Sequence, residues 1–450
     1  MAEDEAERGG QPTGRPGRAL DRRILALAVP ALGALVAEPL FLLADTAMVG
    51  HLGAPALAAL GVASTILQTA VGLCVFLAYT TTPRVARRLG AGDERGAVRA
   101  GIEGMWLGLA VGVALGAAGL LLAGWLPTLI ASDPEVVRLA AGYLGASAWG
   151  LPAMLLVIAA SGLLRGLQDA RTPLVVATAG FLGNVALNAV LIYGLDLGVL
   201  GSAIGTVLAQ WAMALAYLWM ARRAAWRTGA SLAPGVGGVR RAIADSALML
   251  LRNLTIRAVL IAVAMVGAAA GVAELAALQV ILTVFSLLSF ALDALAIAGQ
   301  SIIGHDLGAR RFGEVRATTS RLIRWGIGSG LACAALGLAL APVAGRLFTG
   351  DEQVLALLPL GFALLAAAAP IAGYVFVLDG ILIGAGDIRY LALGGLAPMA
   401  LSLGAYAAIG ALGLHGAAAV AAIWSAFGLV FLGGRSVVLG LRARQDVWMR

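Results

Sequence analysis

Two acidic residues stand inside a stretch that is apolar enough to cross a membrane. Glu38 and Asp45 lie within residues 30–53, which read PALGALVAEPLFLLADTAMVGHLG. A charge at the centre of a membrane helix costs about 2.5–3.5 kcal/mol even on the mildest scale, so two carboxyls there need a function or a partner. They are seven residues apart, which is two helical turns and places both on nearly the same face. This spacing indicates a proton or cation site.

The same stretch contains two prolines that allow the helix to bend. Pro30 and Pro39 each lack a backbone donor, and a proline inside a helix kinks it. Desolvation favours the neutral form of a buried carboxyl, so a proton could be exchanged here for a transported molecule. Asp45 is the first candidate for this coupling and Glu38 the second. The alternative for Asp45 is a structural carboxyl that is hydrogen-bonded to backbone near a helix end. The alternative for Glu38 is membership of a structural pair.

The composition is that of a polytopic membrane protein. Of the 450 residues, 61% are hydrophobic and 12% are charged, whereas soluble proteins average about 25% charged residues. The net charge of +7 comes from arginines between apolar segments, where membrane topology explains them better than nucleic-acid binding does. Cys74 and Cys333 lie in apolar runs and are expected to fill the core, and the three histidines are isolated.

Twelve apolar stretches are long enough to span a bilayer, and they predict an all-α protein with two lobes of six helices. They cover residues 24–50, 57–82, 98–124, 136–164, 173–195 and 199–221, then 242–269, 275–303, 316–345, 354–385, 390–411 and 415–440. The expected divisions are a disordered cytoplasmic tail (1–21), an N-lobe (22–221), a cytoplasmic linker (222–241), a C-lobe (242–440) and a C-terminal tail (441–450).

The arginines indicate the orientation of the chain. They gather in the loops that follow the even-numbered spans: Arg84, Arg87, Arg88, Arg95, Arg99, Arg171, Arg222, Arg223, Arg227, Arg240, Arg241, Arg310, Arg311, Arg316 and Arg389. The other loops carry little beyond Arg138 and Arg346. Positively charged loops stay on the cytoplasmic side, so both termini are predicted to be cytoplasmic and the protein to lie in the inner or plasma membrane.

The two halves of the chain repeat. LAALGVASTILQTA from Leu57 matches LAALQVILTVFSLL from Leu275, and GLLRGLQDAR from Gly162 matches GILIGAGDIR from Gly380. Leu89-Gly90-Ala91 likewise matches Leu307-Gly308-Ala309. All three pairs share one separation in the numbering, the distance from Leu57 to Leu275, which we call the repeat offset. Six spans separate equivalent positions, so the halves have the same orientation, and two such lobes enclose a central cavity in many transporters.

Further polar residues inside the spans are candidates for lining this cavity. Asn184 and Asn188 are one turn apart on the fifth span, and Thr206 lies on the sixth, where packing through interhelical hydrogen bonds is the alternative. The counterpart of Asp45 in the second half falls near Ala262 or Val263, both apolar, so the acid belongs to one lobe.

The C-lobe has acids of its own. For Asp293 the sequence allows either a role in the cavity or a structural ion pair. For Asp379 it favours the structural ion pair. Arg252 and Arg257 on the seventh span are the possible partners of these acids. Glu274 is expected to be solvated in the external loop before the eighth span.

The energy source is expected to be an ion gradient. The sequence has no GxxxxGK[ST] motif and no lysine, so ATP hydrolysis is not expected. The glycine-containing LGAGD and LGARR turns are weak signals for phosphate binding. We expect no cofactor, no metal and no enzymatic activity, because no metal-ligand cluster or nucleophile motif is present.

The sequence resembles the multidrug and toxic compound extrusion (MATE) family, and most closely its DinF-like branch. The resemblance rests on RRILALAVPALGALVAEPLFLLADTAMVGHLG, on LLRGLQDARTP, on ALDALAIAGQSIIGHDLGARR and on LDGILIGAGD, and it runs from about residue 22 to 440. It implies twelve helices in a V of two lobes, and a monomer that exchanges cations for organic, often cationic or amphipathic compounds.

The resemblance also implies roles for individual residues. Asp45 corresponds to the protonation site of the branch, Pro30 to a proline that bends on protonation, and Asp379-Gly380 to the branch's pair on span ten. The Asn-x-x-x-Asp pattern on span five reads Asn184-x-x-x-Asn188 here, a departure that weakens a sodium site and favours protons as the coupling ion.

These observations predict a proton-coupled multidrug exporter, with sodium as the alternative ion. A flippase for lipid-linked precursors is the second hypothesis, and Arg252 and Arg257 would supply its cationic cavity. A membrane-embedded enzyme is the third. The nature of the cargo is not encoded in a recognisable motif.

Overall fold

Every element in the described part of the chain is helical. The computed structural model describes residues 16–449, and within them it contains helices and no strands. Eleven helical stretches are long and apolar enough to cross a membrane, and a bent pair, α5 and α6, makes a twelfth span if it is counted as one. Some of the eleven join successive elements, as Ala54–Gly90 joins α2 and α3. The predicted all-α, multi-pass fold is therefore confirmed.

The first half of the chain forms α1 to α8. The helices are α1 (Pro16–Gly50), α2 (Ala54–Cys74), α3 (Phe76–Gly90), α4 (Glu94–Leu122), α5 (Pro134–Ala148), α6 (Leu151–Gly166), α7 (Arg171–Ala189) and α8 (Gly198–Thr228), with short turns η1 (Leu126–Leu129) and η2 (Val190–Gly194). Apolar residues dominate each of them, and aspartates cap some starts: the side chain of Asp93 accepts from the Gly96 N–H, and Asp133 caps α5.

The second half forms α9 to α16. The helices are α9 (Val236–Ala270), α10 (Val272–Gly308), α11 (Phe312–Phe348), α12 (Glu352–Gly384), α13 (Ile388–Gly394), α14 (Leu396–Ala411), α15 (Gly416–Ser425) and α16 (Gly433–Ala443), with η3 (Ala426–Leu432) and η4 (Asp446–Met449). Asp351 caps α12 by accepting from the N–H groups of Gln353 and Val354.

Helix extends into segments expected to be irregular. α1 begins at Pro16, so the end of the predicted N-terminal tail is helical, and residues 1–15 lie outside the described part. α8 continues to Thr228 and α9 begins at Val236, which leaves a short connection where a linker of 222–241 was predicted. At the other end, Trp448 and Met449 are buried. Intrahelical hydrogen bonds and apolar contacts thus order segments that look polar in sequence.

The backbone repeats with the same period as the sequence. Four pairs of residues with positive φ are each separated by the repeat offset: Gly53 and Gly271, Gly92 and Arg310, Gln168 and Gly386, and Gly198 and Gly416. Such conformations are rare outside glycine, so their recurrence at one offset shows that the two halves turn at equivalent places.

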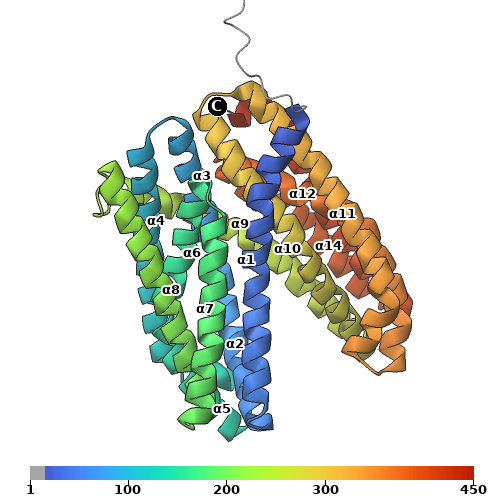
Figure 1. Cartoon of the computed structure of the whole chain (residues 1–450). Coiled ribbons are helices and arrows are strands. Elements are labelled where there is room, and N and C mark those ends of the chain that lie inside the picture. Colours follow the sequence, from blue (N-terminus) through green and yellow to red (C-terminus); the bar gives the residue numbers. More distant parts are fainter. Residues whose placement is uncertain (1–15, 450) are drawn as a thin grey trace, which may run out of the picture.

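The two halves form separate lobes that touch at one end. We call α1–α8 the N-lobe and α9–α16 the C-lobe; they diverge from the end at which α1 begins and the chain ends (Figure 1). At this closed end α3 crosses α10 so tightly that a Cβ on Gly90 would lie 1.9 Å from the carbonyl oxygen of His305, and a Cβ on Gly308 would lie 1.9 Å from that of Arg87. The two contacts are related to each other by the internal repeat.

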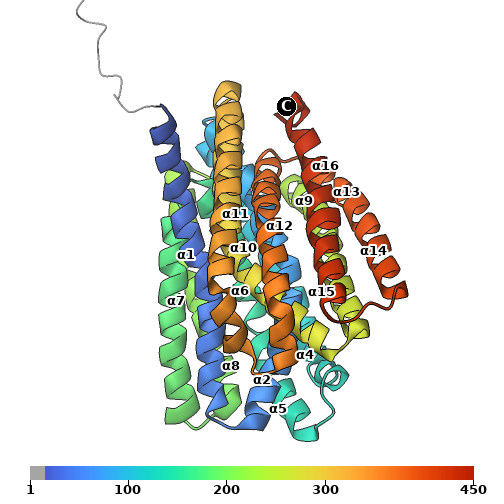
Figure 2. The same cartoon turned by 90° about the vertical axis from the view of Figure 1, so that its right-hand side faces the viewer.

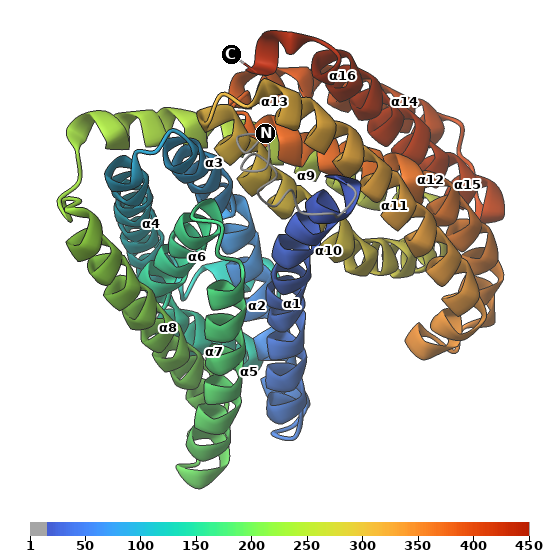
Figure 3. The same cartoon turned by 45° about the horizontal axis from the view of Figure 1, so that its top comes forward.

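Helix α1 lies between the lobes. It packs against α7 of its own lobe and against α10 of the other, as Figure 3 shows. Seen from the side of the C-lobe, α11 stands near α1, whereas α13 and α14 form the outer edge (Figure 2). The packing of α1 on α10 is thus the most extensive contact between the lobes after the α3–α10 crossing.

Glu274 is buried, contrary to the expectation that it is solvated. Its carboxylate accepts a hydrogen bond of 2.6 Å from the backbone N–H of Gly416, and the neighbouring His415 ring contacts the carbonyl oxygen of Ala270 at 2.5 Å. The first turn of α10 is therefore held to the first turn of α15, because orphan N–H groups at a helix start need an acceptor.

The crossing glycines give a prediction about stability. A methyl group at position 308 or at its counterpart 90 overlaps the backbone of the other lobe, and overpacking of this kind typically costs about 1–3 kcal/mol. We expect Gly308→Ala and Gly90→Ala to lower the melting temperature of the purified protein by similar amounts. Gly313→Ala is the control, because its Cβ meets no atom within 4 Å. Equal melting temperatures for Gly308→Ala and Gly313→Ala would contradict the tight crossing.

Candidate functional site

Asp45 is the centre of a buried polar site in the N-lobe. Its side chain is only 2% exposed and accepts hydrogen bonds from three other helices. The Asn188 carboxamide on α7 donates at 2.9 Å, the Tyr143 hydroxyl on α5 donates at 3.3 Å, and the Ser202 hydroxyl on α8 makes a short hydrogen bond to the same carboxyl. The carboxyl on α1 therefore joins four helices of one lobe.

A second layer of amides holds these donors in place. Asn188 also donates to the Asn184 side-chain oxygen at 3.2 Å, and Asn184 donates to the Thr206 hydroxyl at 3.1 Å. Gly205 makes the close approach of α8 possible, because a Cβ there would lie 2.0 Å from the Asn188 side-chain oxygen. Asn184, Asn188 and Thr206 thus lie around Asp45, where the sequence suggested them.

Ser202 and Tyr143 were missed by the sequence analysis. Ser202 precedes Thr206 by one turn on α8, and this spacing on one helix face was an available signal. Tyr143 lies on α5, before the bend between α5 and α6, and nothing in its local sequence points to α1.

All the side chains that donate to Asp45 are neutral. The three donors are an amide and two hydroxyl groups, and the described residues show no ion pair at this carboxyl. Burying an ionised carboxylate without a counter-charge costs several kcal/mol even when it is hydrogen-bonded. A proton or a bound cation removes that cost, so the site is suited to exchanging one.

The other candidate residues of the first span, Pro30 and Glu38, are not among the hydrogen-bond partners found for Asp45 in the described residues. Pro30 is buried within α1, which runs unbroken as helix past both Pro30 and Pro39. The Glu38 side chain lies outside the described residues. Pro30 lies between Arg23, which pairs with the C-lobe, and Asp45. Apolar contact with the C-lobe continues past Pro30, because Ala31 packs against Ala294 and Ile297 of α10.

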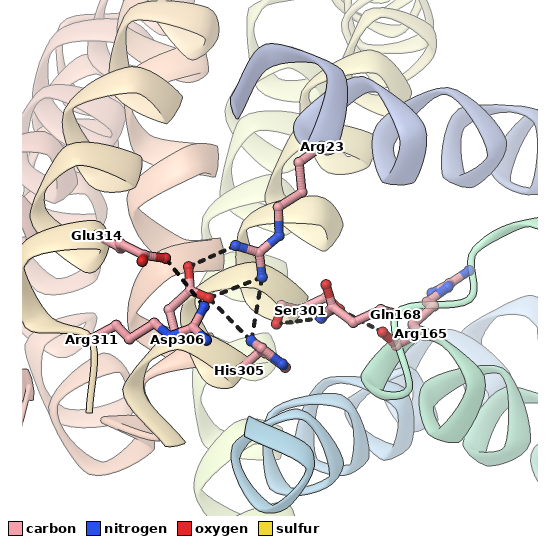
Figure 4. A network of polar contacts seen from close by, with 8 residues as sticks. All are labelled: Arg23, Arg165, Gln168, Ser301, His305, Asp306, Arg311 and Glu314. Carbon is pink, nitrogen blue, oxygen red and sulfur yellow. Dashed lines mark hydrogen bonds and ion pairs between the residues drawn. The ribbon is translucent and has the colours of Figure 1, made fainter. Parts of the chain in front are cut away.

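The first part of α1 is held to the C-lobe by ion pairs at the closed end. The guanidinium of Arg23 donates to both carboxylate oxygens of Asp306 on α10, at 2.9 and 3.0 Å, and Asp306 is completely buried (Figure 4). Two residues earlier, Asp21 accepts from Arg321 Nε at 2.6 Å and from Trp325 Nε1 at 2.8 Å, both on α11.

A second set of contacts joins the lobes beside Arg23. The Gln168 amide donates to the Ser301 carbonyl at 2.8 Å and to its hydroxyl at 2.6 Å, and the Ser301 hydroxyl donates to the carbonyl of Arg165 (Figure 4). These contacts close the end of the molecule at which the lobes meet, and they must break if the lobes are to separate there.

The C-lobe carries its acids in another arrangement. Asp379 is buried and pairs with Arg252 at 2.8 Å, and also with Arg435, which the sequence analysis did not select. Asp293 is partly buried and makes no hydrogen bond among those found in the described residues. The ion pair suggested for Arg252 is therefore present, and it includes a third residue.

Arg257 does not join the acids, contrary to the suggestion that it is a partner. It is exposed and reaches across to Gly72 on α2, where its Nη2 would lie 3.1 Å from a Cβ. Five residues separate it from Arg252, a rotation of roughly 140° around a helix, so the two arginines face different ways.

The repeat places no second Asp45 site in the C-lobe. Adding the repeat offset to Asp45, Asn188, Ser202 and Thr206 leads to Val263, Tyr406, Val420 and Trp424. These are buried, and the Trp424 ring packs against Phe427 and Phe285 at centroid distances of 5.1 and 6.0 Å. Apolar packing thus fills the C-lobe where the N-lobe holds its carboxyl.

Comparison with known sequences agrees with this architecture. The profile of the MatE family matches residues 30–190 and 249–403, one segment in each half of the chain. The chain belongs to the MATE family. Its members are membrane transporters, and the expected resemblance is confirmed.

Individual MATE relatives cover most of the chain. Protein DETOXIFICATION 43 of Arabidopsis thaliana is 29% identical over 85% of this chain and 84% of its own length. DNA damage-inducible protein F of Escherichia coli (strain K12) is 28% identical over 64% of each chain. The fold matches a solved outward-facing multidrug resistance MATE transporter of the MOP superfamily with a TM-score of 0.81, at 20% identity over 96% of this chain and 99% of that one.

The closed end of this MATE protein can be tested by accessibility. Replacing Arg23 by Gln leaves the buried Asp306 without its bidentate partner, and charge-assisted hydrogen bonds are worth about 1.5–3 kcal/mol. We expect the lobes to part more often, so that a cysteine introduced at Ala86, beneath Gly304 of the other lobe, reacts several-fold faster with a thiol reagent.

The labelling experiment needs a protein without its two native cysteines. Cys74 and Cys333 are both buried and free, so they can be replaced by alanine. Arg22→Gln is the matched control, because Arg22 is the exposed neighbour of Arg23. Equal labelling rates in the Arg23 and Arg22 variants would show that the Arg23–Asp306 pair does not hold the closed end together.

Proposed function

We propose that the chain is a secondary active multidrug efflux antiporter that exports organic cationic or amphipathic compounds in exchange for protons. The observation that carries the proposal is Asp45, a buried carboxyl inside a membrane helix whose hydrogen-bond partners among the described residues are all neutral. Such a group is costly when ionised and is relieved by a proton, so its protonation state can be linked to a change in packing.

Helix α1 connects that carboxyl to the contact between the lobes. Asp45 lies in the N-lobe, whereas Asp21 and Arg23 of the same helix contact the C-lobe. A change of packing around Asp45 is therefore transmitted along α1, past Pro30, to the closed end. Alternating access by rocking of the two lobes requires a link of this kind.

The orientation follows from the arginines. Arg87, Arg88, Arg310 and Arg311 lie at the ends of α3 and α10, at the closed end. Positively charged loops stay in the cytoplasm, so the closed end is cytoplasmic, both termini are cytoplasmic, and the lobes open outward. The cell membrane is the proposed location, and the similar solved transporter is named as outward-facing and of multidrug resistance.

Protons are favoured over sodium by the composition of the site. Within the described residues no group of three or more His, Cys, Asp or Glu side chains comes together, and Asp45 has no second carboxylate among its partners. Sodium and other hard cations prefer several oxygen ligands and more than one negative charge.

The experiment is uptake of a fluorescent organic cation into everted membrane vesicles, under an imposed pH gradient and separately under an imposed sodium gradient. We expect uptake that follows the pH gradient and falls at least about tenfold in Asp45→Asn, because the amide cannot be protonated and deprotonated at physiological pH. The variants must be compared at equal abundance.

A matched substitution separates this role from a loss of folding. Asp351→Asn changes an N-cap at the start of α12, where asparagine caps as well as aspartate, so uptake should be unchanged. Uptake retained by Asp45→Asn would refute the role of Asp45. Uptake driven by sodium alone would move the coupling ion to sodium, and no uptake under either gradient would favour the lipid flippase.

A further inference from the structure

The C-lobe contains a buried cluster with more positive than negative charge. Arg252 of α9 and Arg435 of α16 both donate to a single carboxylate oxygen of Asp379 on α12, the first at 2.8 Å. The three side chains are at most 10% exposed. Two cations therefore share one anion within membrane-spanning helices.

Neighbouring charges do not cancel the excess. Asp293 and Arg165 lie within electrostatic range of this cluster, and they contribute one negative and one positive charge. With both aspartates ionised, the five residues together retain one positive charge. An uncompensated charge inside a membrane protein costs several kcal/mol, so this cluster is stabilised by a further negative charge.

A pocket opens at the two arginines. It is formed between α9, α13 and α16 and is lined by Arg252, Thr255, Gly394, Gly395 and Arg435. Its cavity volume is about 10 Å³, which is room for roughly one water-sized group. The glycines leave room in its wall, since a Cβ on Gly395 would lie 3.2 Å from the Thr255 hydroxyl. Leucine and valine side chains form the remaining wall.

Each of the two arginines has an N–H group without a hydrogen-bond partner among the described residues. The Nε–H groups of Arg252 and Arg435 are buried and make no hydrogen bond, although both residues are more than nine-tenths buried. The second carboxylate oxygen of Asp379 also lacks a hydrogen-bond partner. Unsatisfied buried donors cost about 1–3 kcal/mol each, and an anionic acceptor satisfies them best.

We propose that this pocket binds a small monovalent anion, either chloride or a single carboxylate group. One excess positive charge matches one negative charge, and two guanidinium donors within apolar walls suit a compact acceptor. The site is confined to the C-lobe, because the N-lobe counterparts of Arg252 and Arg435 at the repeat offset are Ala34 and Tyr217. It is separate from the Asp45 site and does not depend on the proposed antiport.

The test is thermal unfolding of the purified protein in detergent, with sodium chloride replaced stepwise by sodium gluconate at constant ionic strength. Binding to the folded state alone raises the melting temperature with chloride in a saturable way, by about 3–5 °C at a hundred times the dissociation constant. A melting temperature that is independent of chloride and of formate would overturn the proposal, because water would then be sufficient.

Two substitutions change the charge of the cluster in opposite directions. Arg435→Gln leaves Asp379 paired with Arg252 and removes the excess charge, so the anion-dependent shift should vanish while the protein still folds. Asp379→Asn adds one positive charge and should tighten anion binding on the order of tenfold. Arg346→Gln, an exposed C-lobe arginine, is the matched control and should respond to chloride as the unaltered protein does.

A parallel titration with sodium formate decides whether the bound anion is a carboxylate or a halide. A larger shift with formate than with chloride assigns the pocket to a carboxylate, and the reverse assigns it to a halide. An equal chloride response in Arg435→Gln and Arg346→Gln would remove the pocket as the site. Failure here leaves the vesicle uptake and its Asp45 dependence untouched, so the two proposals can fail separately.

Discussion

The structure depends on how a carboxyl group is accommodated inside a membrane, where an unpaired charge is costly. The two lobes solve this problem in opposite ways. In the N-lobe, the donors to Asp45 among the described residues are all neutral, and in the mechanism that we propose a proton cancels its charge. In the C-lobe, Asp379 is permanently paired with two arginines. One acid is therefore able to change state, and the other is held in a fixed one.

Helix α1 connects Asp45 to the contact between the two lobes. Its end near Asp45 is joined to α5, α7 and α8, while its beginning is joined to α10 and α11 of the other lobe. Pro30 and Pro39 both lie between these two sets of hydrogen bonds and cannot donate a backbone hydrogen bond, so the helix is weakened at both points. In the proposed mechanism, a local change at this carboxyl alters the contact between the lobes.

The sequence was sufficient to predict the spans, the repeat and part of the N-lobe site. Hydropathy and a shared offset are properties of the chain itself, and the one-turn spacing of Asn184 and Asn188 places both on one face. Ser202 and Tyr143 were not found, because their role depends on which helices pack together around α1. Arg435 was overlooked since an arginine near the end of the last span looks like a topology signal.

The repeat explains why chemistry can differ between lobes that share a backbone. The turns at positive φ and the glycine crossing at Gly90 and Gly308 recur at one offset, so they belong to the scaffold and constrain how the lobes meet. The Asp45 site does not recur: Val263 and Trp424 occupy the positions equivalent to Asp45 and Thr206, and Ser402 stands where Asn184 would be. The backbone scaffold is thus symmetric while the side chains are not, and the proton exchange that we propose would take place in the N-lobe alone.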